Sequence, residues 1–297
     1  MSVTGLDGQA TPAPVTSPRL ARQVYVAARP PRRGAPRRSI VLGSQLLVVV
    51  AVLAAWQWLP TVHSVSSHVG VLNRDFIASP SSIAGQIGSL VGGKSASTFW
   101  PAIGETLRST IIGGLIGSAV GMLGGLLLSQ SQFAAKVLKP FITAFNATPL
   151  IAFIPIIVVI FGITAESSIL SAALLSVFVV FFNAIEGGRS VRSEVLSNAK
   201  LLGATRFSIM ARVRFPYVLA WTFTALPVAI SFALVGAVAT EFLVGVPGIG
   251  KLLTLALSFG DPRLTFALAV LLGVSGALLV AIVSMARSRV LHWWENS

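Results

Sequence analysis

The stretch TLRSTIIGGLIGSAVGMLGGLLL, residues 106–128, decides the fold class of this chain. After Arg108 it carries no charge, and it has the length of about 20 residues that an α-helix needs to cross the hydrocarbon core of a bilayer. Glycine recurs at every fourth position, so the glycines share one face, where a second helix can approach closely and gain dispersion contacts. The stripe predicts helix packing inside one subunit, with a dimer contact as the alternative; it comprises Gly113, Gly117, Gly121 and Gly125.

Similar apolar runs recur along the rest of the chain. Hydrophobic residues make up 54% of its 297 residues and charged residues only 10%, and the mean hydropathy is +0.84. A soluble domain of this size could not bury so much apolar surface. We therefore predict an all-α, polytopic membrane protein with about six transmembrane helices. The expected spans are 40–60, 108–128, 141–162, 167–187, 217–240 and 264–286.

The net charge of +13 raises the question of nucleic acid, and the distribution of the charge answers it. With six spans, one side of the membrane receives seven arginines from the N-terminal tail, two lysines from 129–139, six basic residues from 188–215 and two arginines near the C-terminus. The other side receives five: Arg74, Lys94, Arg108, Lys251 and Arg263. The positive-inside rule predicts this asymmetry for a protein with both termini in the cytoplasm, so no nucleic-acid partner is expected.

The spans divide the chain into further regions. Residues 1–39 are rich in Pro and Arg and have no apolar period, which predicts a disordered basic cytoplasmic tail, either solvated or bound to membrane lipid. Residues 61–105 are predicted to be extracytoplasmic with short helices, because Ser79-Pro80 forms a helix start. Residues 106–287 then form a core of five transmembrane helices, and 288–297 a cytoplasmic tail.

The cytoplasmic loop 188–215 contains the amphipathic stretch NAKLLGATRFSIMARVRFP (198–216). Leu202 shares one helical face with Val195 and Ala199, and Gly203 can end that helix in the left-handed conformation. Thr205 is then the expected N-cap of a second short helix.

In that second helix, Phe207 and Met210 are expected on one apolar edge and Ile209 and Val213 on another. Charge comes from Arg206, Arg212 and Arg214. Basic amphipathic loops also rest on the inner leaflet of a membrane. A helix pair divided by a glycine favours docking of a cytoplasmic partner over that lipid contact.

The third expected span contains Pro149 and Pro155 within an apolar run. Proline in a membrane helix favours a bend, and bent helices either line a cavity or form a static kink. The third to fifth spans are otherwise apolar and contain few hydrogen-bonding side chains. These few side chains are candidates for lining a translocation pathway. These candidates are Asn146, Thr148, Asn183, Thr224 and Ser231, with Pro149 at the bend.

The stretch VGVPGIG, residues 244–250, cannot continue a regular helix. The chain is therefore expected to turn at the outer face, close to Glu241. The turn is either purely structural or part of an outer gate or docking surface, formed with Glu241 by Gly245, Pro247, Gly248 and Gly250.

Several kinds of chemistry find no support in the sequence. Cysteine is absent, and the three histidines are scattered, so no catalytic thiolate or metal centre is expected. The helix centres hold no Asp, Glu, Lys, Arg or His, whereas ion-coupled carriers usually need such groups near the midplane. No catalytic residue is expected, and the energy for any transport comes from elsewhere.

Five features together resemble the permease subunits of binding-protein-dependent ABC importers, in particular the nitrate, sulfonate and taurine branch. Ala199-x-x-x-Gly203-Ala204, followed by Pro216, is similar to the cytoplasmic coupling loop of that family. The glycine-striped span of 106–128 also matches, and further stretches that match are FIASPSSI (76–83), NATPLIAFIPIIVVIFGI (146–163) and ATEFLVGVPGIGKLL (239–253).

This resemblance implies a type I importer permease that forms a dimer, expected as a homodimer, in the cytoplasmic (inner) membrane. Two cytoplasmic ATP-binding subunits would bind ATP and Mg and hydrolyse ATP, while an extracytoplasmic solute-binding protein would deliver a small polar solute, with an anionic one as the narrower class. The residues expected to couple to the ATPase are Ala199, Leu202, Gly203, Ala204, Thr205, Arg206, Phe207, Met210 and Arg212. An ion-coupled secondary transporter or channel and a membrane scaffold are the alternatives.

Overall fold

The computed structural model describes residues 38–58 and 78–291. The chain divides into two units, 1–54 and 55–297, each of which is described by itself. The helix α2, Arg38–Trp58, crosses the boundary between them and corresponds to the first expected span. Apart from the first residues of α2, the predicted N-terminal tail lies outside the described residues, as do 61–77 and 292–297.

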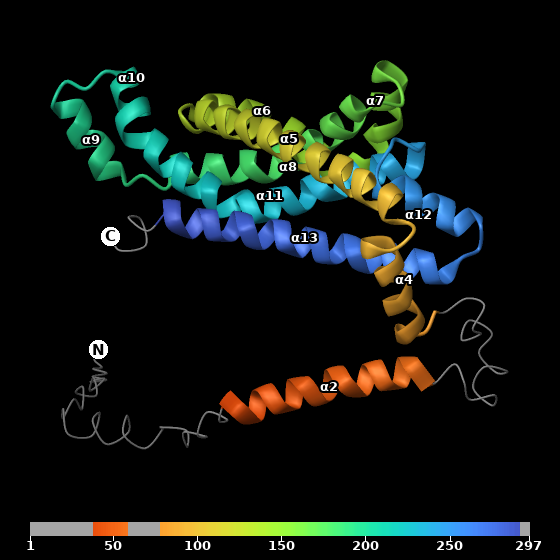
Figure 1. Ribbon diagram of the computed structural model, residues 1–297. Coiled ribbons are helices and arrows are strands. Elements are labelled where there is room, and N and C mark those ends of the chain that lie inside the picture. The colour runs from red at the N-terminus through yellow and green to blue at the C-terminus, as the bar shows by residue number, and fades with distance from the viewer. Residues whose placement is uncertain (1–37, 59–77, 292–297) are drawn as a thin grey trace, which may run out of the picture. The chain divides into compact units, whose positions relative to one another are not determined.

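The second unit is a bundle of helices with α9 and α10 at one end and α12 at the other, here called the α9 end and the α12 end (Figure 1). No strand occurs among the described residues, and the predicted all-α fold is confirmed. Its elements are α4 (Pro80–Gly92), α5 (Ala96–Ser129), α6 (Gln132–Ala147), η3 (Leu150–Phe153), α7 (Ile154–Phe161), α8 (Ala165–Arg189), α9 (Ser193–Leu201), α10 (Arg206–Ile209), η4 (Met210–Arg214), α11 (Phe215–Val244), α12 (Ile249–Ser258) and α13 (Pro262–Val290).

Four described helices are long and apolar enough to cross a membrane: Ala96–Ser129, Ala165–Arg189, Arg206–Val244 and Pro262–Val290. Each contains one of the expected spans. The helix α5 begins at Ala96, well before residue 108, and Pro101 lies inside it. The apolar part of α2, Leu42–Trp58, is shorter than these four.

The expected span 141–162 is broken in the region where Pro149 predicted a bend. Lys136–Phe145 and Leu150–Phe161 meet at an angle of 81°, so they form at most one broken span. The physical reason is local: Thr148 precedes Pro149, and a residue before proline is pushed from helical to extended backbone, as its ψ of 131° shows. If this pair is counted as one span, the described residues hold up to five helices long and apolar enough to cross a membrane, and α2 adds a shorter apolar helix.

The glycine stripe of α5 lies against α8 of the same chain. A β-carbon at Gly117 would collide with the side chain of Ser176 and the carbonyl group of Ala173. The same close approach to α8 occurs at Gly113, Gly121 and Gly125. Only the absence of side chains allows the two backbones to lie so close together, which increases their dispersion contacts.

A second stripe of small residues, which was not predicted from the sequence, joins α11 to α8. Alanine recurs at every fourth position of α11, and the four residues are buried: Ala225, Ala229, Ala233 and Ala237. Ala233 and Ala237 pack against Ala172 of α8. The spacing of these alanines was a readable signal of the same kind as the glycine stripe.

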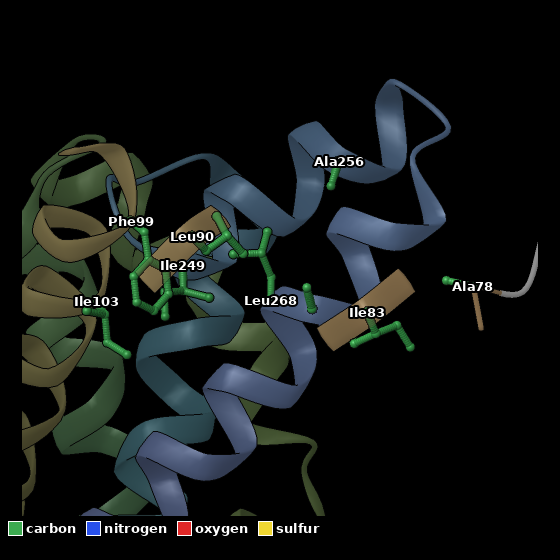
Figure 2. Close-up of a cluster of buried hydrophobic side chains, with 9 residues drawn as sticks. Ala78, Ile83, Leu90, Phe99, Ile103, Ile249, Ala256 and Leu268 are labelled. Atoms are coloured by element: carbon green, nitrogen blue, oxygen red, sulfur yellow. The ribbon is translucent and has the colours of Figure 1, made fainter. Parts of the chain in front are cut away.

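The α12 end is closed by an apolar cluster (Figure 2). Figure 2 shows Leu90 of α4, Phe99 of α5, Ile249 of α12 and Leu268 of α13 gathered together, and all four are buried. The predicted helix after Ser79-Pro80 is present as α4, and Leu90 anchors it to the bundle. This cluster holds the turn between α11 and α12 in place.

Candidate functional site

The segment from Ser193 to Arg214, here called the coupling segment, begins with α9 and its C-terminal cap. Gly203 has a φ of +78°, in the left-handed region. The Gly203 N–H donates to the carbonyl of Lys200 and the Ala204 N–H to that of Ala199, each at 3.0 Å. This pair of bonds is the Schellman motif, so α9 ends by using the conformational freedom of glycine.

The second part of the coupling segment begins at Thr205 and joins the membrane helix directly. The Thr205 Oγ1 accepts a hydrogen bond from the Ser208 N–H at 3.2 Å, as an N-cap should. However, α10 is not a separate short helix, because it continues through the five-residue π-helix η4 into α11. The 39-residue helix Arg206–Val244 is about 58 Å long, which exceeds the hydrocarbon core, so part of it lies outside the membrane.

The coupling segment exposes three large apolar side chains. Leu201, Leu202 and Phe207 are 85%, 88% and 72% exposed, respectively. Leu202 therefore does not share the half-buried face of Val195 and Ala199, because α9 ends at Leu201 and the chain turns there. Leu201 was not among the expected coupling residues, although it directly precedes Leu202 and the glycine turn.

Met210 and Phe207 differ in their exposure, although they were expected to share one apolar edge: Phe207 is exposed and Met210 is not. Met210 is half-buried and packs on the cluster of Leu126, Ala184 and Val218, which come from α5, α8 and α11. Met210 therefore connects the coupling segment to the core of the bundle.

The three arginines of this region have different surroundings. Arg206 and Arg212 are exposed and make no ion pair with any described residue. Arg214, expected to add surface charge, is half-buried, and its Nη1 donates to the Ser129 carbonyl at 2.8 Å. This bond ties the start of α11 to the C-terminal end of α5.

The α12 end contains a polar cluster, here called the Glu241 latch, which joins three helices. The Thr106 Oγ1 of α5 donates to the Glu241 Oε2 of α11 at 2.8 Å and accepts from the Ile249 N–H of α12 at 2.9 Å. The Gly250 N–H also donates to Oε2, at 3.0 Å. Glu241 is fully buried, and its Oε1 has no hydrogen-bond partner among the described residues.

The turn after α11 allows this latch to form. Gly245 ends α11 in the left-handed conformation, with a φ of +78°, and α12 begins at Ile249. A β-carbon at Gly248 would collide with the carboxyl group of Glu241. Pro247 is exposed, whereas Gly248 and Gly250 are buried. Glu241 is therefore enclosed by its own turn, and the outer gate or docking role of this set of residues stays a prediction.

Four of the expected pathway residues use their polar side-chain groups within their own helices. Each hydroxyl or amide group donates to the carbonyl four residues earlier in its own helix: Thr148 to Ala144, Asn183 to Val179, Thr224 to Ala220 and Ser231 to Pro227. The side chain of Asn146 lies outside the described residues, and Pro149 is at the break before η3. Within residues 38–58 and 78–291, no three acidic or histidine side chains could hold a metal.

Comparison with known proteins assigns this bundle to a family. The family described as "Binding-protein-dependent transport system inner membrane component" matches residues 98–292, which include both the coupling segment and the Glu241 latch. The chain belongs to this family of permeases. It is thus the membrane component of a binding-protein-dependent ABC importer, a transport component without catalytic activity of its own.

Individual relatives of this permease carry several different substrate names. The riboflavin transport system permease protein RibX of Chloroflexus aurantiacus is 28% identical, covering 74% of this chain and 81% of RibX. A probable ABC transporter permease protein of Haemophilus influenzae is 29% identical, covering 80% and 92%. The nitrate import permease protein NrtB of Leptolyngbya laminosa is 25% identical, covering 67% and 71%.

A solved structure shows the same fold. The permease resembles a chain of the MetNI methionine ABC transporter in an inward-facing conformation, with a TM-score of 0.57 and 19% sequence identity. The match covers 67% of this chain and 98% of that chain. The predicted type I importer fold is therefore confirmed.

Proposed function

We propose that the coupling segment is the docking site for a cytoplasmic ATP-hydrolysing subunit, with two such subunits serving a dimer of this permease. The observation that carries the proposal is the exposure of Leu201 and Leu202 at the end of α9 and of Phe207 at the start of a helix too long for the bilayer. Arg206 and Arg212 flank this apolar surface and would attract acidic groups on the partner. ATP and Mg would bind to the partner, because this chain contributes the mechanical link and no catalytic group.

The link between docking and transport would run through Met210 and Arg214. Met210 packs on α5, α8 and α11, and Arg214 is bonded to the end of α5. A displacement of the coupling segment would therefore move these three helices together. Met210 and Arg214 are the first and last residues of the π-helix η4, a type of element often found at functional sites. Closure of the ATPase pair would bias the permease between two states through such differential contacts.

The α9 end would face the cytoplasm and the α12 end the exterior, where the solute-binding protein docks. Most of the 22 basic residues then lie in cytoplasmic segments, as the positive-inside rule requires, and both termini are cytoplasmic. The names of the relatives include riboflavin and nitrate, which supports a small polar solute as the substrate class. The Glu241 latch would hold the turn at the outer end of the pathway as part of a gate.

Loss of the exposed apolar side chains tests the docking site. The double variant Leu202→Ser, Phe207→Ser removes apolar surface that would be buried in the complex, and each such side chain stabilises by about 1.5–3 kcal/mol when fully buried. We expect copurification of the ATPase subunit to fall at least about tenfold. Phe259→Ser is the matched control, because Phe259 is 82% exposed near the α12 end. Unchanged copurification in the double variant, with normal membrane abundance, would contradict the proposed site.

The pathway is proposed to pass along the third to fifth spans, near Asn146, Thr148, Pro149, Asn183, Thr224 and Ser231. Single cysteines at the five polar positions are informative because the natural chain has no cysteine. We expect a small, water-soluble thiol reagent to label at least some of them during turnover, since a polar solute needs a hydrated route. Val159→Cys on an exposed apolar face should remain unlabelled. Protection of all five positions would refute this route.

A further inference from the structure

A large cavity lies at the α9 end, where α5 and α8 terminate and α11 begins. It has a volume of about 800 Å³ and is walled by α5, α6, α8, α9 and η4. Three basic side chains line it, each from a different element: Lys136 of α6, Arg189 of α8 and Arg214 of η4. Glu186 is the acidic side chain in the wall, so the cavity has a net positive charge.

These three basic side chains have few hydrogen-bond or ion-pair partners among the described residues. Lys136 and Arg189 make no hydrogen bond or ion pair with any described residue, and neither pairs with Glu186. Arg214 uses Nη1 to bind the Ser129 carbonyl, while its Nε is buried without an acceptor in the described part of the chain. A buried N–H group of a guanidinium without a partner is costly, and an anion would satisfy it.

The remaining wall indicates what sort of anion fits. Apolar side chains lie beside the basic ones, contributed by Leu128, Ile142, Phe182, Ile185 and Leu196. A phosphate ion is far smaller than this cavity and has no apolar part. A phospholipid headgroup carries a phosphodiester for the cations and a glycerol with the start of two acyl chains for the apolar wall. The ends of apolar helices are also where headgroups lie in a bilayer.

We propose that this cavity binds the phosphodiester headgroup of an anionic phospholipid, held by Lys136, Arg189 and Arg214. We assign the lipid to the inner leaflet because the proposed function places the α9 end on the cytoplasmic side of the membrane. The bound headgroup would connect α6, α8 and η4, so the lipid would stiffen the start of α11. Soluble phosphate shares the relevant chemistry, and the test separates these two sources.

The experiment uses the full-length chain purified in a non-ionic detergent, with bound lipid counted by native mass spectrometry. The probes are dioctanoyl phosphatidylglycerol and, as a zwitterionic match, dioctanoyl phosphatidylcholine. The test variant is Lys136→Gln, Arg189→Gln, which removes two charges and no described hydrogen bond. Arg192→Gln is the matched control, because Arg192 is exposed at the start of α9 and does not line the cavity.

We expect the wild-type chain to bind phosphatidylglycerol more tightly than phosphatidylcholine, and the double variant to lose about 30-fold in affinity for it. The Arg192 control should bind like the wild type. Equal binding of the two lipids by the wild type, or an unchanged affinity in a double variant that elutes as a normal species, would overturn the proposal. If inorganic phosphate binds and phosphatidylglycerol does not, the proposal that the bound anion is a lipid headgroup is wrong. Because no ATPase is present, a failure here leaves the proposed function unaffected.

Discussion

Replacement of Gly203 by valine is expected to reduce uptake at least about tenfold while the permease still inserts in the membrane. Gly203 has a φ of +78°, and a residue with a β-carbon pays roughly 1–2 kcal/mol in this conformation, a β-branched one more. Apart from Gly203 itself and its two neighbours in the chain, no atom of the described residues lies within 4 Å of the position of a β-carbon at Gly203. The effect therefore comes from the backbone alone, which would lose the Schellman motif and reorient α9. Insertion depends on the apolar helices and should not change.

The measurement compares uptake, copurification of the ATPase subunit and abundance in the membrane for this variant and the wild type. Gly203→Asn is the matched control, because asparagine tolerates the left-handed conformation far better than valine does. We expect asparagine to retain most of the uptake and valine to lose both uptake and firm ATPase binding. If the valine variant transports normally, the coupling segment is only a connector that contacts lipid.

Truncation of Glu241 to alanine is expected to lower both the thermal stability of the permease and its uptake. The change leaves the buried Gly250 N–H without an acceptor and removes the bond from Thr106, so α5, α11 and α12 lose their common polar contact. An unsatisfied buried group costs about 1–3 kcal/mol, and the void left by the side chain adds to it. The thermal unfolding temperature of the purified chain and uptake in cells are the two measurements.

Glu241→Gln serves as the control for shape, because its amide oxygen can still accept from Thr106 and Gly250. We expect the glutamine variant to keep most of the stability and uptake that the alanine variant loses. If the alanine variant equals the wild type in both measurements, the latch contributes neither to stability nor to gating. If only uptake falls, the latch has a role in the transport cycle beyond holding the fold.

Features that depend on nearby residues could be predicted from the sequence. The four long membrane helices follow from runs of apolar residues, and the left-handed Gly203 and the N-cap Thr205 follow from the backbone preferences of single residues. The glycine stripe of α5 was readable because its period is that of one helix face. The break before Pro149 was placed in the correct region, but its angle of 81° depends on how η3 and α7 pack.

Features that depend on distant residues were decided only by the tertiary structure. Thr106 and Glu241 are 135 positions apart, so no local pattern could pair them or show that Glu241 is enclosed rather than exposed. The burial of Met210, in contrast to the exposed Phe207, depends on the neighbouring helices α5, α8 and α11, on which Met210 packs. The sequence by itself determined the membrane class, the main helices and the local caps, because these depend on hydrophobic length and on backbone conformation. Only the packed bundle decided which polar groups meet, since those contacts form once helices distant in the chain lie side by side.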